Sequence, residues 1–418
     1  MWSVEWDGRR HADMVSKNIH IDNLKAKQIW LRAQGLLEPI FSTEGANAVA
    51  RTVEHLGYVQ IDTINVIERC HHHILWTRLP DYRRADLHAA QSVEKSVFEY
   101  WTHALSYIPT RDLRFFVRAM KEHRANPGGW FKSVSKADLR KVMTLVKKGG
   151  ALTIRDIEDD VLQEKDHPWA SRKPSKRALQ LAFYSGLLAI SERNGMLKSY
   201  DLIGRHFGWE RAPKAASTAE VAEYLLDRAL RSQGLVSLDS ICHLDAPSKA
   251  AVRKVIERRT RRKELVAVQL NDAGKQVHWA SPETLDAAHD DLGGHVHILS
   301  PFDPLVIQRK RLKLFFGYEH RFEAYLPKER RVYGYFALPV LVDGEIVAAI
   351  DFKTDREAKA LLIQKWTWIA RSGRKDLKRR IEEKIGQFET FQVNTSGAEA
   401  GEPNNLQSLE DNSLSLGT

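Results

Sequence analysis

The feature that most constrains this fold is an order of helix and hairpin patterns in the middle of the chain. Residues 137–148, the stretch LTIRDIED and residues 175–186 predict three successive helices. Asn194-Gly195 then separates two strand-like runs, and Asn-Gly is a strong short-range signal for a β-hairpin. Three helices followed by a hairpin is the plan of a winged helix, whose third helix reads DNA.

The same order recurs in the next part of the chain. Residues 218–233, 238–244 and 248–262 predict helices, and ELVAVQL-NDAGK-QVHWA predicts a hairpin with an Asp-Ala-Gly turn. Residues 21–67 read as a degraded further copy. Repetition of one DNA-reading plan is a stronger signal than a single helix-turn-helix pattern. We therefore predict a mainly α fold with β wings (α+β), built from tandem winged helices.

The composition changes after Leu299. Short β-rich runs such as RVYGYFALPVLV and GEIVAAIDFKTD are split by Gly, Pro and Asp, which suggests a small sheet or barrel. Residues 375–388 predict a closing helix. The predicted boundaries are a loose leader at 1–18, repeat regions at 19–130, 131–212 and 213–295, a β-rich element at 296–394 and a disordered acidic tail at 395–418.

The net charge indicates a polyanionic partner. The chain carries +10, and outside the acidic tail 64 bases stand against 50 acids. Basic residues gather in SRKPSKR, RKVIERRTRRK and RSGRKDLKRR, and the first two fall on the predicted third helices. Each cluster alone fits a solvated helix face, whereas three together favour nucleic-acid backbone contact. The candidate DNA-binding residues are Arg172, Lys173, Lys176, Arg177, Arg258, Arg259, Arg261, Arg262 and Lys263.

Several classes of protein are disfavoured. The only cysteines are Cys70 and Cys242, which excludes a disulfide scaffold and a four-cysteine zinc site. No apolar run approaches the length of about 18 residues that spans a bilayer, and the N-terminus lacks the apolar core of a secretory signal. Phosphate-binding glycine motifs are absent, so we expect no ATP, NAD or other cofactor. We expect no membrane partner and a cytoplasmic location.

The stretch Gln60-Ile61-Asp62 is a candidate for chemistry. Residues 58–67 are β-branched and alternating, so they read as a strand, in which residues two apart share a face. Gln60 and Asp62 would then stand side by side with Ile61 in the core. An amide can hold a water while a carboxylate accepts its proton. The alternative for Asp62 is a cap on the following turn.

Histidines and aromatics near this stretch are further candidates. In an extended segment, His71 and His73 would share one face. They could line a site or form a polar strand edge. A zinc site would need more ligands, so we expect no metal. Tyr100, Trp101 and His103 lie in EYWTHALSYIP. We expect core packing for Trp101, with base stacking as the alternative. We expect Asp303 in SPFDP to cap a turn. A role as a second catalytic acid is the less favoured alternative.

The chain resembles a known family at several motifs in the same order. HLGYVQIDTINVIERCHHHILWTRLPDY, EYWTHALSYIP, LSPFDPLVIQRKR, YEHRFEAYLP and RVYGYFALPVL resemble the YcaQ-type (AlkX) bacterial DNA glycosylases, relatives of AlkZ. The resemblance covers roughly residues 21–394. It implies three tandem winged helices in a C-shaped arrangement with a concave basic surface, plus a barrel-like C-terminal β element.

The resemblance also implies an activity. It points to hydrolysis of the N-glycosidic bond of N7-alkylguanine in double-stranded DNA, including unhooking of interstrand crosslinks at the nucleoid. The YcaQ branch carries Gln-apolar-Asp, so Gln60 and Asp62 are the implied catalytic pair. The rival hypothesis is a winged-helix regulator or architectural protein without catalysis. A regulator usually dimerises on two half-sites, and we expect a monomer. An RNA-processing nuclease is a weaker idea, because no cluster of carboxylates stands out.

Overall fold

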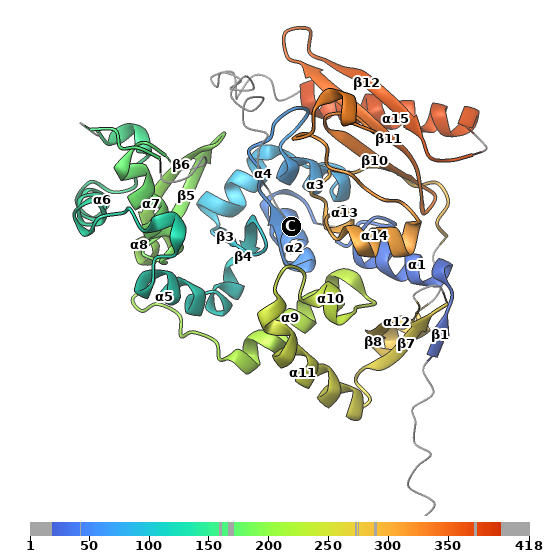
Figure 1. Ribbon diagram of the computed structural model, residues 1–418, viewed down its shortest axis with the longest axis horizontal. Coiled ribbons are helices and arrows are strands. Elements are labelled where there is room, and N and C mark those ends of the chain that lie inside the picture. The colour runs from blue at the N-terminus through green and yellow to red at the C-terminus, as the bar shows by residue number, and fades with distance from the viewer. Residues whose placement is uncertain are drawn as a thin grey trace, which may run out of the picture.

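The chain mixes helices and strands around several small sheets (Figure 1). The computed structural model describes residues 19–41, 43–158, 161–165, 171–271, 274, 276–287, 291–371 and 374–393. The predicted leader (1–18) and acidic tail (395–418) lie outside these ranges. Within them, no helix is long and apolar enough to cross a membrane.

The element order predicted for the middle of the chain is present twice. The second unit contains α6 (Lys136–Gly149), η4 (Ile154–Asp156), α7 (Pro174–Tyr184), β5 (Leu188–Asn194) and β6 (Leu197–Leu202). The third unit contains α9 (Thr218–Gln233), α10 (Leu238–Ile241), α11 (Lys249–Arg261), β7 (Val266–Leu270) and β8 (Val277–Ala280). In both units a residue before the short second helix bridges to the last strand, Leu152 to Tyr200 and Val236 to Trp279.

A first unit with the same order precedes them. It contains α2 (Gly45–Leu56), β2 (Val59–Gln60), α3 (Cys70–Arg78), α4 (Arg84–His88), β3 (Val97–Trp101) and β4 (Leu105–Pro109), and β2 again pairs with the last strand. This copy runs over residues 45–109, within the predicted region 19–130 and extending beyond the stretch 21–67 that suggested it. α1 (Asn23–Ala33) lies before it, and β1 (Ile19–Ile21) pairs in parallel with β7 of the third unit.

The C-terminal part is an open sheet rather than a barrel. β9 (Val296–Ile298), β10 (Ala337–Val342), β11 (Glu345–Asp355) and β12 (Ala360–Trp368) form four antiparallel strands in the order β12-β11-β10-β9. The two outer strands do not pair, so among the described residues no barrel closes and this part of the fold prediction was wrong. α15 (Arg374–Val393) confirms the closing helix and buries Ile381 and Phe388.

Short helices connect these parts. They are η1 (Ala89–Val93), η2 (Thr110–Phe115), α5 (Val117–Ala125), η3 (Gly129–Phe131), α8 (Ile203–Phe207), η5 (Ala246–Ser248), α12 (Pro282–Asp286), α13 (Pro304–Ile307), α14 (Arg309–Phe316) and η6 (Lys328–Arg330). η2 and α5 form the helical segment that follows Pro109.

The first unit is the centre to which the other parts are attached (Figure 1). Its helices share one apolar core with β10, β11 and α15. Arg193 of the second unit forms a buried ion pair with Glu99 of β3, with Nη2 at 2.6 Å from Oε2. Arg231 of the third unit donates from Nε to the Glu54 carbonyl oxygen at 3.0 Å. The elements that hold the candidate site are thus fixed against all three neighbours.

Two local expectations in the first unit were wrong. The strand predicted over 58–67 ends at Gln60, because the Asp62 carboxylate accepts a hydrogen bond from the Ile64 backbone N–H at 2.8 Å and turns the chain. The extended segment predicted at 70–73 is the start of α3. Every residue of α3 is buried, and a helix buried on all sides shows no amphipathic period.

Candidate functional site

Gln60 and Asp62 follow a tight helix-to-strand turn. α2 ends at Gly57, which has a φ of +81°, and β2 begins two residues later. A Cβ at Gly57 would lie 2.3 Å from Cγ of Arg228 on α9, so this turn requires glycine for both its conformation and its packing. Ile61 is buried, as predicted. Gln60 is 5% exposed, and Asp62, just past the strand end, is half-buried.

Gln60 is fixed by His103 from the turn between β3 and β4. Nε2 of His103 lies 3.1 Å from Oε1 of Gln60, and Oγ1 of Thr102 lies 3.3 Å from Nδ1. Burial, with the neighbouring His243 and Arg228 charges, lowers the pKa of His103 to about 4, so its ring is neutral at pH 7. Because the Gln60 oxygen can only accept, Nε2–H donates to it, and Nδ1 of the neutral ring is an acceptor beside the Thr102 hydroxyl.

This arrangement leaves the other end of the Gln60 amide available. The backbone carbonyl of Gln60 accepts from the Cys70 thiol at 3.0 Å, which ties the strand to α3. The side-chain nitrogen of Gln60 has no hydrogen-bond partner among the described residues. An amide held through its oxygen can donate from its nitrogen to a water or a sugar oxygen in a fixed direction.

Asp62 has the electrostatics of a proton acceptor. Burial raises the pKa of its carboxyl group above 3.8, while backbone hydrogen bonds from Ile64 and Thr63 act in the opposite direction. Burial destabilises the ionised form of a carboxyl group, so a buried carboxylate accepts a proton more readily than an exposed one. The capping role considered for Asp62 is also present, through Ile64.

Tyr325 is a site residue that sequence reasoning missed. It lies in a turn of the segment 318–327, is 51% exposed and touches Phe322 edge-on with ring centroids 5.7 Å apart. Burial raises the pKa of Tyr325, and the negative charge of Asp62 acts in the same direction. Its only sequence signal is the motif YEHRFEAYLP.

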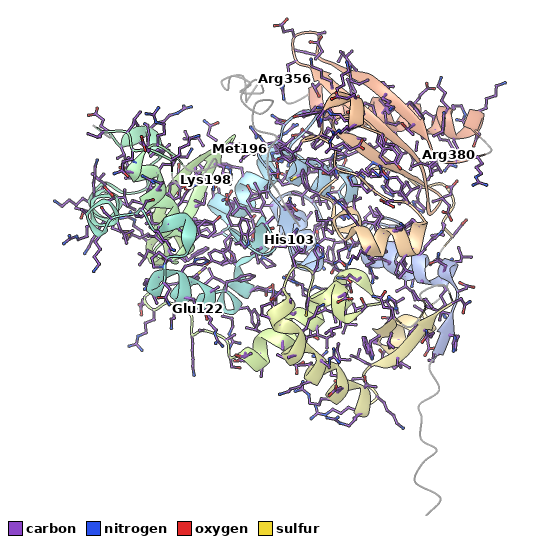
Figure 2. All side chains as sticks on the ribbon, in the orientation of Figure 1. His103, Glu122, Met196, Lys198, Arg356 and Arg380 are labelled. Atoms are coloured by element: carbon purple, nitrogen blue, oxygen red, sulfur yellow. The ribbon has the colours of Figure 1, made fainter. Side chains whose placement is uncertain are left out.

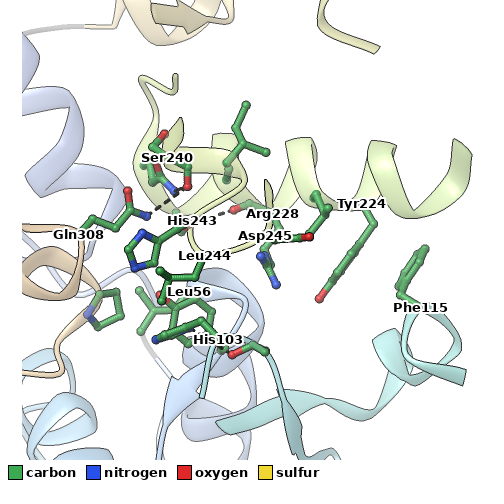
Figure 3. A pocket seen from close by; sticks show the side chains of 18 of the residues that line it. Leu56, His103, Phe115, Tyr224, Arg228, Ser240, His243, Leu244, Asp245 and Gln308 are labelled. Carbon is green, nitrogen blue, oxygen red and sulfur yellow. Dashed lines mark hydrogen bonds between the residues drawn. The ribbon is translucent and has the colours of Figure 1, made fainter. Parts of the chain in front are cut away.

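A cavity of about 280 Å³ opens beside His103, between the first and third units (Figure 3). Its lining includes Leu56, Tyr58, His103, Arg228, His243 and Leu244. The guanidinium of Arg228 lies 5.8 Å from the Tyr58 ring centroid and supplies the positive charge. The His103 and His243 rings are 5.7 Å apart, and burial lowers the pKa of His243 as well.

The structure brings only some of the expected lining residues to this cavity, and neither Gln60 nor Asp62 is part of its lining. His103 and Trp101 both line the cavity, and Trp101 is 48% exposed, so the core role predicted for it was wrong. Tyr100 is buried and donates from its hydroxyl to the Tyr184 carbonyl oxygen at 2.7 Å. A buried side chain packed in this way does not line an open site.

The histidines of α3 are also interior residues rather than an exposed edge. The His71 ring packs 4.2 Å from that of His72, and His73 stacks on Phe388 with centroids 4.5 Å apart. Nε2 of His73 lies 2.8 Å from the Ile298 carbonyl oxygen. Within the described ranges, no three His, Cys, Asp or Glu residues are grouped so that they could hold a metal ion.

Asp303 is structural. Its carboxylate caps α13 by accepting from the Leu305 N–H at 2.9 Å, which confirms the capped turn. It also forms two hydrogen bonds with Arg78, whose side chain is 1% exposed. Because the Asp303 carboxylate is buried and bound to the Arg78 guanidinium, it is not available as a second acid.

The basic clusters separate into exposed and internal residues. Arg172, Lys173 and Lys176 are exposed at the N-terminus of α7, and Arg261, Arg262 and Lys263 are exposed at the end of α11.

The remaining arginines of the clusters have partners within the protein, and only Arg177 is too buried to meet DNA as predicted. Arg177 is buried and donates from Nη1 to the Ser133 hydroxyl at 2.7 Å. Arg258 pairs with Glu223 of α9, and Arg259 pairs with Glu223 and with Asp227, the latter at 2.6 Å.

Two comparisons with known proteins agree. The family model described as DNA glycosylase AlkZ-like matches residues 53–391 of the chain. Among solved structures, the Streptomyces sahachiroi DNA glycosylase AlkZ is similar, with a TM-score of 0.53 and 18% sequence identity. The match covers 89% of this chain and 97% of that chain. At this identity the structural likeness concerns the fold.

Proposed function

The chain belongs to the AlkZ-like DNA glycosylase family, and from this premise we propose that it hydrolyses the N-glycosidic bond of N7-alkylguanine in double-stranded DNA. We extend the proposal to unhooking of interstrand crosslinks joined through N7. The chain is a DNA glycosylase, as the resemblance at its motifs predicted. The observation that carries the finer proposal is the pair of a fixed Gln60 amide and an Asp62 carboxylate of raised pKa at one strand end.

Alkylation at N7 places a positive charge on the base, so the base leaves without being protonated. As the bond between C1′ and N9 breaks, its electron pair passes to the base and neutralises that charge. The sugar develops oxocarbenium character, which the Asp62 carboxylate stabilises. Water then adds to C1′ and gives its proton to Asp62. The raised pKa of this carboxyl suits its role as the proton acceptor.

In this proposal Gln60 directs the water or the sugar. The Nε2–H of His103 holds the amide oxygen, so the amide nitrogen is aimed in one direction. His103 is a positioning residue here, and its pKa of about 4 keeps it neutral through the working range.

The partial exposure of Asp62 supports a substrate that is tied to the opposite strand. A crosslinked guanine cannot swing fully into an enclosed pocket, as the substrates of ordinary base-flipping enzymes do. Asp62 is half-buried, and Tyr325, whose pKa responds to the charge of Asp62, is 51% exposed. We propose that the three repeated units are winged helices and that the exposed basic residues at α7 and α11 contact phosphates.

We also propose that the enzyme acts as a monomer in the bacterial cytoplasm, at the nucleoid, without metal or cofactor. The elution volume of the purified chain tests the first of these statements. A monomer of 47.8 kDa fits the proposal, and a stable dimer contradicts it.

The activity is tested by base release from a duplex that carries one N7-methylguanine, with the unmodified duplex as the control. We expect free N7-methylguanine and an abasic site that breaks only on treatment with alkali. No lysine lies next to Gln60 in the sequence to form a covalent intermediate that would cleave the strand. Tight binding of the duplex without base release would contradict the proposal and favour a DNA-binding regulator.

A further inference from the structure

An exposed leucine in the third unit has a backbone conformation that leucine rarely adopts. Leu244 follows α10, is 77% exposed and has a φ of +57°. The Asp245 N–H donates to the Cys242 carbonyl oxygen at 3.0 Å, so Leu244 is the third residue of a tight turn. Glycine or asparagine is usual at a third turn position with positive φ.

The residues just before this turn are buried and hydrogen-bonded, so the exposure of Leu244 is a fixed property of the fold. Ile241 and Cys242 are both 3% exposed and belong to the core of the third unit. The carbonyl oxygen of Ser240 accepts from the Gln308 side chain at 3.2 Å. A large apolar side chain is therefore presented to solvent at a strained position, and such outliers gather at functional sites.

Leu244 lies close to a residue of the candidate site. Figure 3 shows Leu244 beside His243 and above Leu56 and His103, in the cavity between the first and third units. The His243 ring lies 5.7 Å from that of His103, which holds Gln60. Trp101, another half-exposed apolar side chain, lines the same cavity.

We propose that Leu244 is a wedge that enters the base stack beside the target guanine, an inference that rests on the proposed glycosylase function. Apolar side chains such as leucine can separate base steps, because they replace part of the lost stacking without requiring a hydrogen bond. A crosslinked guanine that cannot rotate outward still has to be separated from its neighbour before Gln60 and Asp62 reach the sugar. A rigid side chain set next to His103 meets this need.

The direct test is the fluorescence of 2-aminopurine placed next to N7-methylguanine in a duplex bound by the protein. Wild type is expected to raise the fluorescence, because the wedge unstacks the probe. Leu244→Gly removes the wedge and suits the positive φ, so it is expected to fold and to give little rise. Leu244→Met keeps an apolar side chain of similar volume and is expected to behave like wild type.

Base release gives a second readout. Separating a base step costs a few kcal/mol, so Leu244→Gly is expected to slow release from the duplex by about tenfold to a hundredfold. Release from the same lesion in single-stranded DNA is expected to change much less, because that base is already unstacked. Leu145→Ala on α6 removes another exposed leucine, 38% exposed, and serves as the matched control.

The outcomes separate the wedge from the glycosylase proposal. Equal fluorescence rises and equal duplex rates in wild type and Leu244→Gly would overturn the wedge while base release continues. A wild type that releases no base would overturn the proposed function. In that case the fluorescence of the bound duplex still decides whether Leu244 unstacks it.

Discussion

The buried ion pair between Arg78 and Asp303 offers a sharp test of how the first unit is attached to the C-terminal part. The Arg78 side chain is 1% exposed and that of Asp303 is fully enclosed. Nη1 and Nη2 of Arg78 lie 2.7 and 2.9 Å from the two carboxylate oxygens. We expect Asp303→Ala to lower the free energy of unfolding, because it leaves a guanidinium buried without its counter-charge.

Breaking a buried pair in this way costs about 3–5 kcal/mol. The lost cap on the Leu305 N–H adds about 1 kcal/mol. Since whole proteins are stable by only about 5–15 kcal/mol, this loss is a large share of the total free energy of unfolding. Urea unfolding followed by circular dichroism measures the change. Base release per folded molecule should stay close to wild type, because Asp303 does not touch the site.

Two controls sharpen this test. Arg78→Met combined with Asp303→Leu removes both charges and should recover about half of the loss or more. The remaining deficit reflects the lost cap on the Leu305 N–H and the Gln34 carbonyl oxygen, which accepts from Nε of Arg78 at 2.8 Å. Asp376→Ala breaks an exposed pair with Arg379 and should change nothing measurable. A midpoint for Asp303→Ala within the error of wild type would refute the reasoning.

Three further predictions follow from the same structure. Burial lowers the pKa values of His73 and His278 to about 4, so below pH 6.5 the unfolded state binds protons that the folded state excludes. Stability should therefore fall as the pH drops from 6.5 to about 4, by at most about 3 kcal/mol for each residue, in unfolding measured across that range. Arg262→Ala should reduce the slope of log affinity against log salt by about 0.9 if Arg262 meets a phosphate, while buried Arg177→Ala should lower the unfolding midpoint and leave the slope unchanged. Tyr325→Ala should slow single-turnover base release by about tenfold with an unchanged melting temperature, because its ring is half-exposed and would stack on the nucleotide. Tyr325→Phe keeps the ring and should release base at nearly the wild-type rate. Equal losses of rate in both variants would point to the hydroxyl instead.

Sequence reasoning succeeded where local signals and the fold agreed. The helix-and-hairpin order of the second and third units followed from helical spacing and from turn residues such as Gly195, which has a φ of +57°. Ile61 was correctly placed in the core. The link between Gln60 and Asp62 came from the family resemblance, because the tripeptide alone is too common to predict a site.

Sequence reasoning failed where tertiary contacts decided the outcome. The β-branched residues after Gln60 suggest a strand, yet the side chain of Asp62 caps a turn there. α3 is buried on every side, so its sequence shows no helical alternation of apolar and polar residues. Leu244 gives no sequence signal of its positive φ, since leucine is not a turn residue. His103 was a candidate, but its bond to Gln60 joins residues 43 positions apart and only the fold reveals it.

The most direct test of the proposed chemistry compares wild type with Asp62→Asn on a duplex carrying N7-methylguanine or an N7-linked crosslink. The asparagine keeps the shape of the side chain and an oxygen for the Ile64 N–H, and it removes the negative charge and the proton acceptor. We predict that base release in a single turnover falls by about a hundredfold or more while the affinity for the duplex is unchanged. Release by Asp62→Asn at the wild-type rate would contradict the account.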